Sequence, residues 1–165
     1  MEKIIEELIA IIAKEIEAFN KLLATLHEKQ RAIVEGEIDR LNKTVQDESK
    51  LADKTKQLEA SRIERSQELA LELSLDNLNP KLSEIIEKVE EKYAQRLSEQ
   101  RELLRSLIEK IQKLNKNNQY LLNYSLKFIE KSMEALLNGD ATVSFYREDG
   151  EIVKHKQSKV LDHSI

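Results

Sequence analysis

Apolar residues recur every three or four positions along most of this chain of 165 residues, which is the spacing of amphipathic helices. The spacing predicts one helix over residues 2–35 and a second over residues 37–73. Between them stands Gly36, a residue type that adopts left-handed backbone at little cost and therefore often ends helices. A third helix is predicted over residues 80–138, before Gly139. We expect the first two helices to fold back on each other as an antiparallel hairpin.

The middle of the second helix is unusually polar. Glu48, Thr55 and Arg62 occupy positions at which the helical period favours apolar residues. The pattern therefore predicts looser or wetter packing at this level of the hairpin.

The third helix is predicted to be too long to be matched along its whole length by either earlier helix. We expect it either to be broken once, near residues 115–118, or to extend past the bundle at one end. The sequence favours neither alternative.

Two rows of apolar residues, each with a period of seven, follow the third helix. Together they cover about half of the helix circumference, which is wider than the ~100° stripe needed to pack against one core. One row would pack inside the protein while the other binds a partner; alternatively, the helix is buried on two sides within its own bundle. The first row contains Leu107, Leu114, Leu121 and Phe128, and the second contains Ile108, Leu122, Ile129 and Leu136, with Asn115 interrupting it.

After Gly139 the pattern changes. Residues 142–146 are mostly β-branched or aromatic, residues 147–150 have the composition of a turn, and Ile152 begins a second short apolar stretch. A hairpin of this size is only marginally stable in water, so we expect a flexible tail over residues 140–165. The predicted fold is all-α, an elongated antiparallel bundle of three long helices over residues 1–139 followed by that C-terminal tail.

Composition and charge exclude several functional classes. The 27 basic and 31 acidic residues are interleaved and give a net charge of −4, which does not favour nucleic acid as a partner. The apolar run at residues 8–13 is bracketed by charges and is too short for a signal peptide or a membrane anchor. The absence of cysteine fits a reducing compartment, and the cytoplasm is the expected location.

The sequence offers no arrangement suited to catalysis. Its three histidines, His27, His155 and His163, do not share a helical turn as a pair of metal ligands would. There is no glycine-rich phosphate loop and no nucleophile elbow. We therefore predict a binding or structural protein that is not an enzyme and that needs no metal or cofactor.

The same third helix and tail carry a family resemblance. Residues 114–122 read LNKNNQYLL and are followed by an amphipathic run to Leu136, and residues 145–150 read FYREDG. These segments resemble the C-terminal half of the FlgN-type flagellar export chaperones, which typically show an L-N-x-x-N-x-x-L-L helix and a terminal tyrosine-x-x-D/E-G turn. Residues 33–41, IVEGEIDRL, are similar to the first interhelical turn of that family, so the resemblance covers most of the chain in order.

The resemblance implies a cytoplasmic helical chaperone that binds the hook-filament junction proteins FlgK and FlgL before their secretion through the flagellar type III apparatus. In that family the C-terminal helix holds the C-terminal segment of the client, and a tyrosine near the end of the chain contacts the export gate component FlhA. Tyr146 would be that gate residue. The client surface would include Leu114, Asn118, Leu121, Leu122, Ser125, Phe128, Ile129 and Leu136.

A second interpretation of the same apolar face is self-association. A structural coiled-coil protein would use it as the interface of a homo-oligomer. The small polar residues Asn118, Ser125 and Ser132, which are seven positions apart, would contact a client or would set the register within the bundle. Tyr120 and Tyr124 are predicted to be boundary or packing residues.

Overall fold

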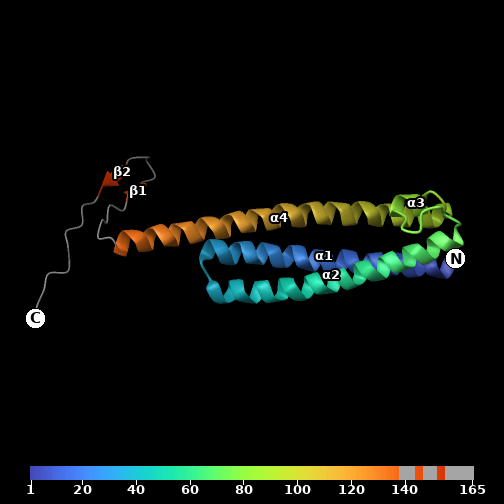
Figure 1. Cartoon of the computed structure of the whole chain (residues 1–165), viewed down its shortest axis with the longest axis horizontal. Coiled ribbons are helices and arrows are strands. Elements are labelled where there is room, and N and C mark those ends of the chain that lie inside the picture. Colours follow the sequence, from blue (N-terminus) through green and yellow to red (C-terminus); the bar gives the residue numbers. More distant parts are fainter. Residues whose placement is uncertain (138–143, 147–151, 155–165) are drawn as a thin grey trace, which may run out of the picture. The chain divides into compact units, whose positions relative to one another are not determined.

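The computed structural model describes residues 1–137, 144–146 and 152–154 (Figure 1). The chain divides into two compact units, Met1–Gln119 and Tyr120–Ile165, and each is described by itself. The predicted all-α class is confirmed. The described elements are α1 (Glu2–Glu35), α2 (Ile38–Glu72), α3 (Leu82–Ile86) and α4 (Glu91–Leu137), with two short strands, β1 (Ser144–Tyr146) and β2 (Ile152–Lys154).

The predicted antiparallel hairpin of α1 and α2 is confirmed (Figure 1). Gly36 ends α1 in left-handed backbone, with a φ of 72°. Its N–H donates to the carbonyl of Ile33, and the N–H of Glu37 donates to the carbonyl of Ala32. This pair of bonds satisfies carbonyl groups that would otherwise lack partners at the helix end.

The three polar residues that interrupt the apolar period of α2 lie on its inward face: Thr55 is buried, and Glu48 and Arg62 are half-buried. The Nε of Arg62 is 3.0 Å from Oε2 of Glu15 on α1, and the Nζ of Lys29 on α1 is 2.7 Å from Oε2 of Glu48. The hydroxyl of Thr55 donates to a main-chain carbonyl one turn earlier in α2, at 2.8 Å. Ion pairs and a main-chain hydrogen bond thus satisfy side chains that interrupt the apolar period.

Glu15 is the charged residue that this arrangement buries most deeply among those described, with 2% of its surface exposed. Burial raises the pKa of its carboxyl group, and the neighbouring guanidinium of Arg62 only partly opposes that rise. The folded chain therefore holds this proton more tightly than the unfolded chain does. As a result, Glu15 favours folding at acidic pH and loses that contribution as the pH rises through its raised pKa.

Two apolar clusters form the core of unit Met1–Gln119, one at each end of the hairpin. The larger cluster lies near the N-terminus of α1 and joins all four helices; its buried members are Ile5, Leu8, Ile9, Ile12, Leu69, Ile85, Tyr93 and Leu97. The smaller cluster lies toward the loop end of the hairpin, and its buried members are Leu22, Leu26 and Leu114. The Glu15–Arg62 pair stands between them along the hairpin.

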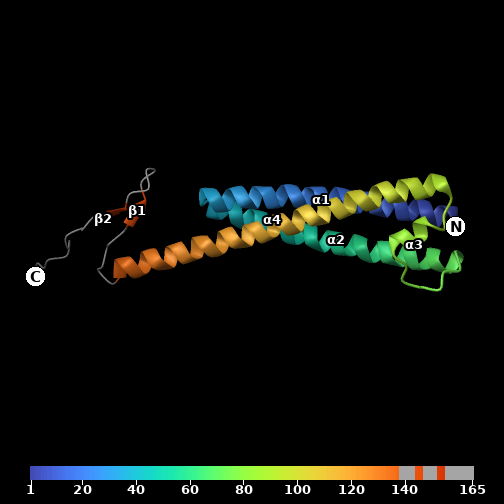
Figure 2. The ribbon, with the colours of Figure 1, turned by 90° about the horizontal axis from the view of Figure 1, so that it is seen from above.

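Within this unit, α4 lies beside α1 and runs in the same direction (Figure 2). The side-chain amide of Gln100 donates to the carbonyl of Ile9 at 3.1 Å, and that of Asn118 donates to the carbonyl of Leu26 at 2.9 Å. Two well-separated hydrogen bonds of this kind fix the register of one helix against the other, because a slip would leave both amides buried without acceptors.

The helix predicted over residues 80–138 is interrupted, but not where expected. The break lies at residues 87–90, between α3 and α4, and α4 is continuous through Asn115 to Asn118. Neither proline nor glycine stands at the break. α3 packs on α2, whereas α4 starts beside α1, where Arg96 lies 2.7 Å from Glu6.

The predicted short hairpin in the tail is present. β1 and β2 pair antiparallel, with Tyr146 opposite Ile152, and the rest of the predicted flexible tail lies outside the described residues. The predicted domain boundary at residues 139 and 140 stays a prediction; the two units meet within α4, at Gln119 and Tyr120. In the part of the chain that is described, no helix combines the length and apolar character of a membrane span.

Candidate protein-binding surface

The last five turns of α4 carry an unusual number of exposed apolar side chains. A helix of 47 residues is longer than either α1 or α2, with 34 and 35, so neither can match its full length. Surface residues of soluble helices are normally polar, and a continuous apolar patch marks a binding site or an aggregation hazard. The exposed members are Tyr120, Tyr124, Leu126, Phe128, Ile129, Met133, Leu136 and Leu137.

The two predicted rows of seven differ in burial. In the first row Leu107 and Leu114 are buried, Leu121 is half-buried and Phe128 is exposed. The second row is open to solvent over most of its length: Ile108, Ile129 and Leu136 are exposed and Leu122 is half-buried. The interpretation in which one row packs inside while the other remains available therefore describes α4 better than burial on two sides.

Leu114 does not lie on the available face. It is buried in the smaller core cluster against Leu22 and Leu26 of α1. The sequence places it in one row with Leu121 and Phe128, and periodicity alone does not show that Leu114 has neighbours on another helix. In this structure Leu114 supports α4 from within, and its predicted contact with a client stays a prediction.

Asn118 is also internal, with none of its surface exposed. Its Nδ2 donates to the carbonyl of Leu26, while its Oδ1 has no hydrogen-bond partner among the described residues. Of the two roles that the sequence left open, the geometry favours setting the register within the bundle. An asparagine that holds a helix carbonyl inside a bundle specifies alignment at some cost in stability.

The two serines of the polar row are half-buried. The hydroxyl of Ser132 donates to the carbonyl of Phe128 at 2.8 Å, within α4 itself. A serine whose hydroxyl already bonds within its own helix needs no hydrogen bond from a partner, and its small size leaves space for a partner side chain. Ser125 and Ser132 therefore form a shallow line between the larger apolar residues.

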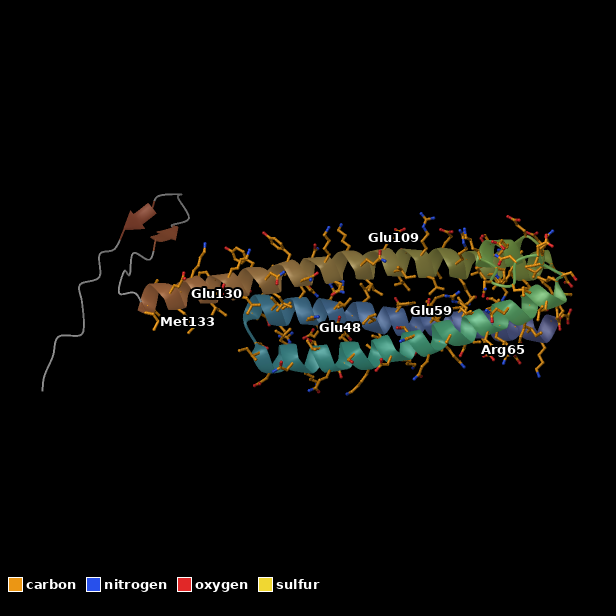
Figure 3. All side chains as sticks on the ribbon, in the orientation of Figure 1. Glu48, Glu59, Arg65, Glu109, Glu130 and Met133 are labelled. Atoms are coloured by element: carbon orange, nitrogen blue, oxygen red, sulfur yellow. The ribbon has the colours of Figure 1, made fainter. Side chains whose placement is uncertain are left out.

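Sequence reasoning missed part of the surface. Tyr120 and Tyr124, predicted to be boundary or packing residues, are 70% and 63% exposed, so that prediction is wrong. A shallow concavity of about 500 Å³ is lined by Leu126, Ile129 and Met133 together with the polar residues Asn123, Lys127 and Glu130. Figure 3 shows the side chains along α4, with Glu130 and Met133 labelled. Leu126 and Met133 each follow a residue of the second row by four positions, one helical turn. The two predicted rows did not include them.

Tyr146, the predicted gate residue, lies in β1, where its backbone pairs with that of Ile152. Its side chain is outside the described part of the structure, so its predicted role stays a prediction. Within the described residues, no group of three or more histidine, aspartate or glutamate side chains is placed to hold a metal ion.

The chain was compared with protein families, with curated proteins and with solved structures. The family model described as FlgN protein matches residues 1–154 of the chain. No curated protein and no solved structure matches the chain.

Proposed function

The chain belongs to the FlgN family, which is a family of flagellar export chaperones, and from this premise we propose which clients it serves and how. In our proposal it acts in the cytoplasm, binds the C-terminal segments of the hook-filament junction proteins FlgK and FlgL, and delivers them to FlhA at the type III export gate.

The exposed apolar surface of α4 is the observation that supports a client-binding role. Helical partners are commonly captured by such faces, with anchors one helical turn apart. We propose that the surface consists of the accessible members of the predicted set, which are Leu121, Leu122, Ser125, Phe128, Ile129 and Leu136. The buried residues Leu114 and Asn118 would hold α4 in place behind it.

The mechanism is shielding without turnover. An amphipathic client segment would bury its apolar face on α4 and so would not aggregate in the cytoplasm. The same segment must later be released, which requires moderate affinity rather than a fully enclosed site, and an open helix face meets this requirement. A separate element, the segment around Tyr146, would engage the gate.

The direct test is binding of a synthetic peptide with the sequence of the FlgK C-terminal segment from the same genome. We expect calorimetry to show a complex of one peptide per chain, and light scattering to show that a chaperone monomer is the binding species. Circular dichroism should change little, because the apolar face is already helical.

The competing interpretation is a structural coiled-coil protein. The same exposed face would then be the interface between copies of the chain, and its exposure supports this interpretation equally. Failure to bind the peptide, together with a stable homo-oligomer that protects Phe128 to Leu136 from hydrogen exchange or labelling, would favour that alternative.

The gate residue is tested separately. A Tyr146→Ala variant is expected to bind the FlgK peptide as the unaltered protein does and to bind the cytoplasmic domain of FlhA at least about tenfold more weakly, because one aromatic anchor often dominates a small interface. Tyr120→Ala is the control for FlhA binding alone, since it removes an exposed aromatic side chain of α4. Unchanged affinity of the Tyr146 variant for FlhA would remove Tyr146 from the gate contact.

A further inference from the structure

A concavity of about 320 Å³ lies between α1 and α4, inside unit Met1–Gln119. Its polar wall is formed by His27 and Gln30 on α1 and by Lys110, Lys113 and Asn117 on α4. Every one of these side chains can donate a hydrogen bond, and two of them are ammonium groups at neutral pH. Among the described residues, none that lines this concavity carries a carboxylate.

The neighbouring carboxylates are engaged elsewhere. Glu109 lies 3.2 Å from Nε of Arg105, and Glu28 contacts Arg31 and Arg40; Figure 3 labels Glu109 on α4. Residues 110–129 contain four lysines and neither aspartate nor glutamate, although the whole chain is acidic. A concavity with surplus positive charge and several donors is complementary to a carboxylate.

We propose that this concavity binds the terminal carboxylate of the client segment, between the ammonium groups of Lys110 and Lys113. The inference rests on the proposed function, because a C-terminal client segment always ends in an α-carboxylate, whatever its side chains are. Gln30 and Asn117 would donate further hydrogen bonds to the same group, which accepts several at once.

The position along α4 fits this assignment. Lys113 precedes Leu121, where the available apolar surface begins, by eight residues, or about 12 Å of helix at 1.5 Å per residue. A helical client segment that lies antiparallel to α4 on the apolar surface would therefore direct its last residues toward Lys113. The two lysines would then also lie near the C-terminal end of the client helix, where positive charge interacts favourably with the helix dipole.

Two peptides and two variants test the proposal. The FlgK C-terminal peptide is prepared with a free carboxylate and with a C-terminal amide. Binding of both is measured by calorimetry at low ionic strength to the unaltered protein, to K110M/K113M and to the control K54M/K116M, which removes two exposed lysines that line neither this concavity nor the one on the apolar surface of α4. Circular dichroism confirms that each variant is folded.

We expect the amide to bind the unaltered protein and the control variant about fivefold to tenfold more weakly than the free acid, as for a partly exposed charge pair. K110M/K113M should bind acid and amide equally. The difference should also shrink as salt is added, because an open site is screened.

Equal binding of acid and amide to the unaltered protein would overturn the proposal and leave the proposed function intact. K110M/K113M binding both peptides equally weakly, with no effect of amidation in the unaltered protein, would show that the lysines contact an acidic side chain instead and would likewise overturn it. Absence of binding by either peptide would contradict the proposed function itself, and the carboxylate site with it.

Discussion

Replacing both Ile129 and Leu136 by aspartate is expected to lower the affinity for the FlgK C-terminal peptide at least about a hundredfold. Both side chains belong to the second apolar row, and they are 54% and 80% exposed, so a client can bury them. Each large aliphatic side chain is worth about 1.5–3 kcal/mol when it is fully buried. An aspartate at the same place adds the cost of removing a charge from water.

The same exposure predicts that the double variant stays folded. Its free energy of unfolding, measured in urea by circular dichroism, should lie within about 1 kcal/mol of the unaltered value, as is usual for surface substitutions. The matched control is Gln112→Asp with Gln119→Asp, which adds the same two charges at exposed positions of α4 that do not line the proposed surface. A double variant that binds the peptide normally would refute the proposed surface, and one that loses its helix content would place Ile129 and Leu136 in the fold instead.

The helices themselves were predictable from sequence because their signals are local. The bounds of α1 follow from apolar periodicity and from Gly36, whose left-handed backbone is observed. The polar positions Glu48 and Arg62 stood out against that periodicity, and both form ion pairs with α1. What the period did not reveal was the partner of Arg62, since Glu15 looks like one of many surface carboxylates until α2 covers it.

The limits of the surface and the break before α4 depend on tertiary contacts. Leu114 and Phe128 belong to one row of seven, yet the first is buried and the second is exposed. Leu114 packs against Leu22 and Leu26 of α1, and the sequence of α4 alone does not show which of its turns have such neighbours. The interruption between α3 and α4 is of the same kind, because neither glycine nor proline marks it.

Asn118 offers the sharpest distinction between a residue that builds the fold and one that contacts a client. Asn118→Asp is expected to lower the free energy of unfolding by about 3–5 kcal/mol at neutral pH, the usual cost of an unpaired buried charge. The variant carboxylate no longer donates to the carbonyl of Leu26, 2.9 Å from Nδ2 in the unaltered protein, and instead faces it with a negative charge. Asn117→Asp, one residue earlier and exposed, should change stability by no more than about 0.5 kcal/mol.

The loss of stability caused by Asn118→Asp should depend on pH. Burial would raise the pKa of the new carboxyl group above the ~3.9 of an unfolded aspartate, so the folded variant would bind the additional proton more tightly. Its deficit relative to the unaltered protein should therefore be largest at neutral pH and should shrink at about pH 4, where the protonated acid can again donate to Leu26. Urea unfolding at both pH values measures this difference. If Asn118→Asp instead unfolds like the unaltered protein at both pH values and loses only peptide affinity, Asn118 contacts the client, and its hydrogen bond to α1 contributes little to the fold.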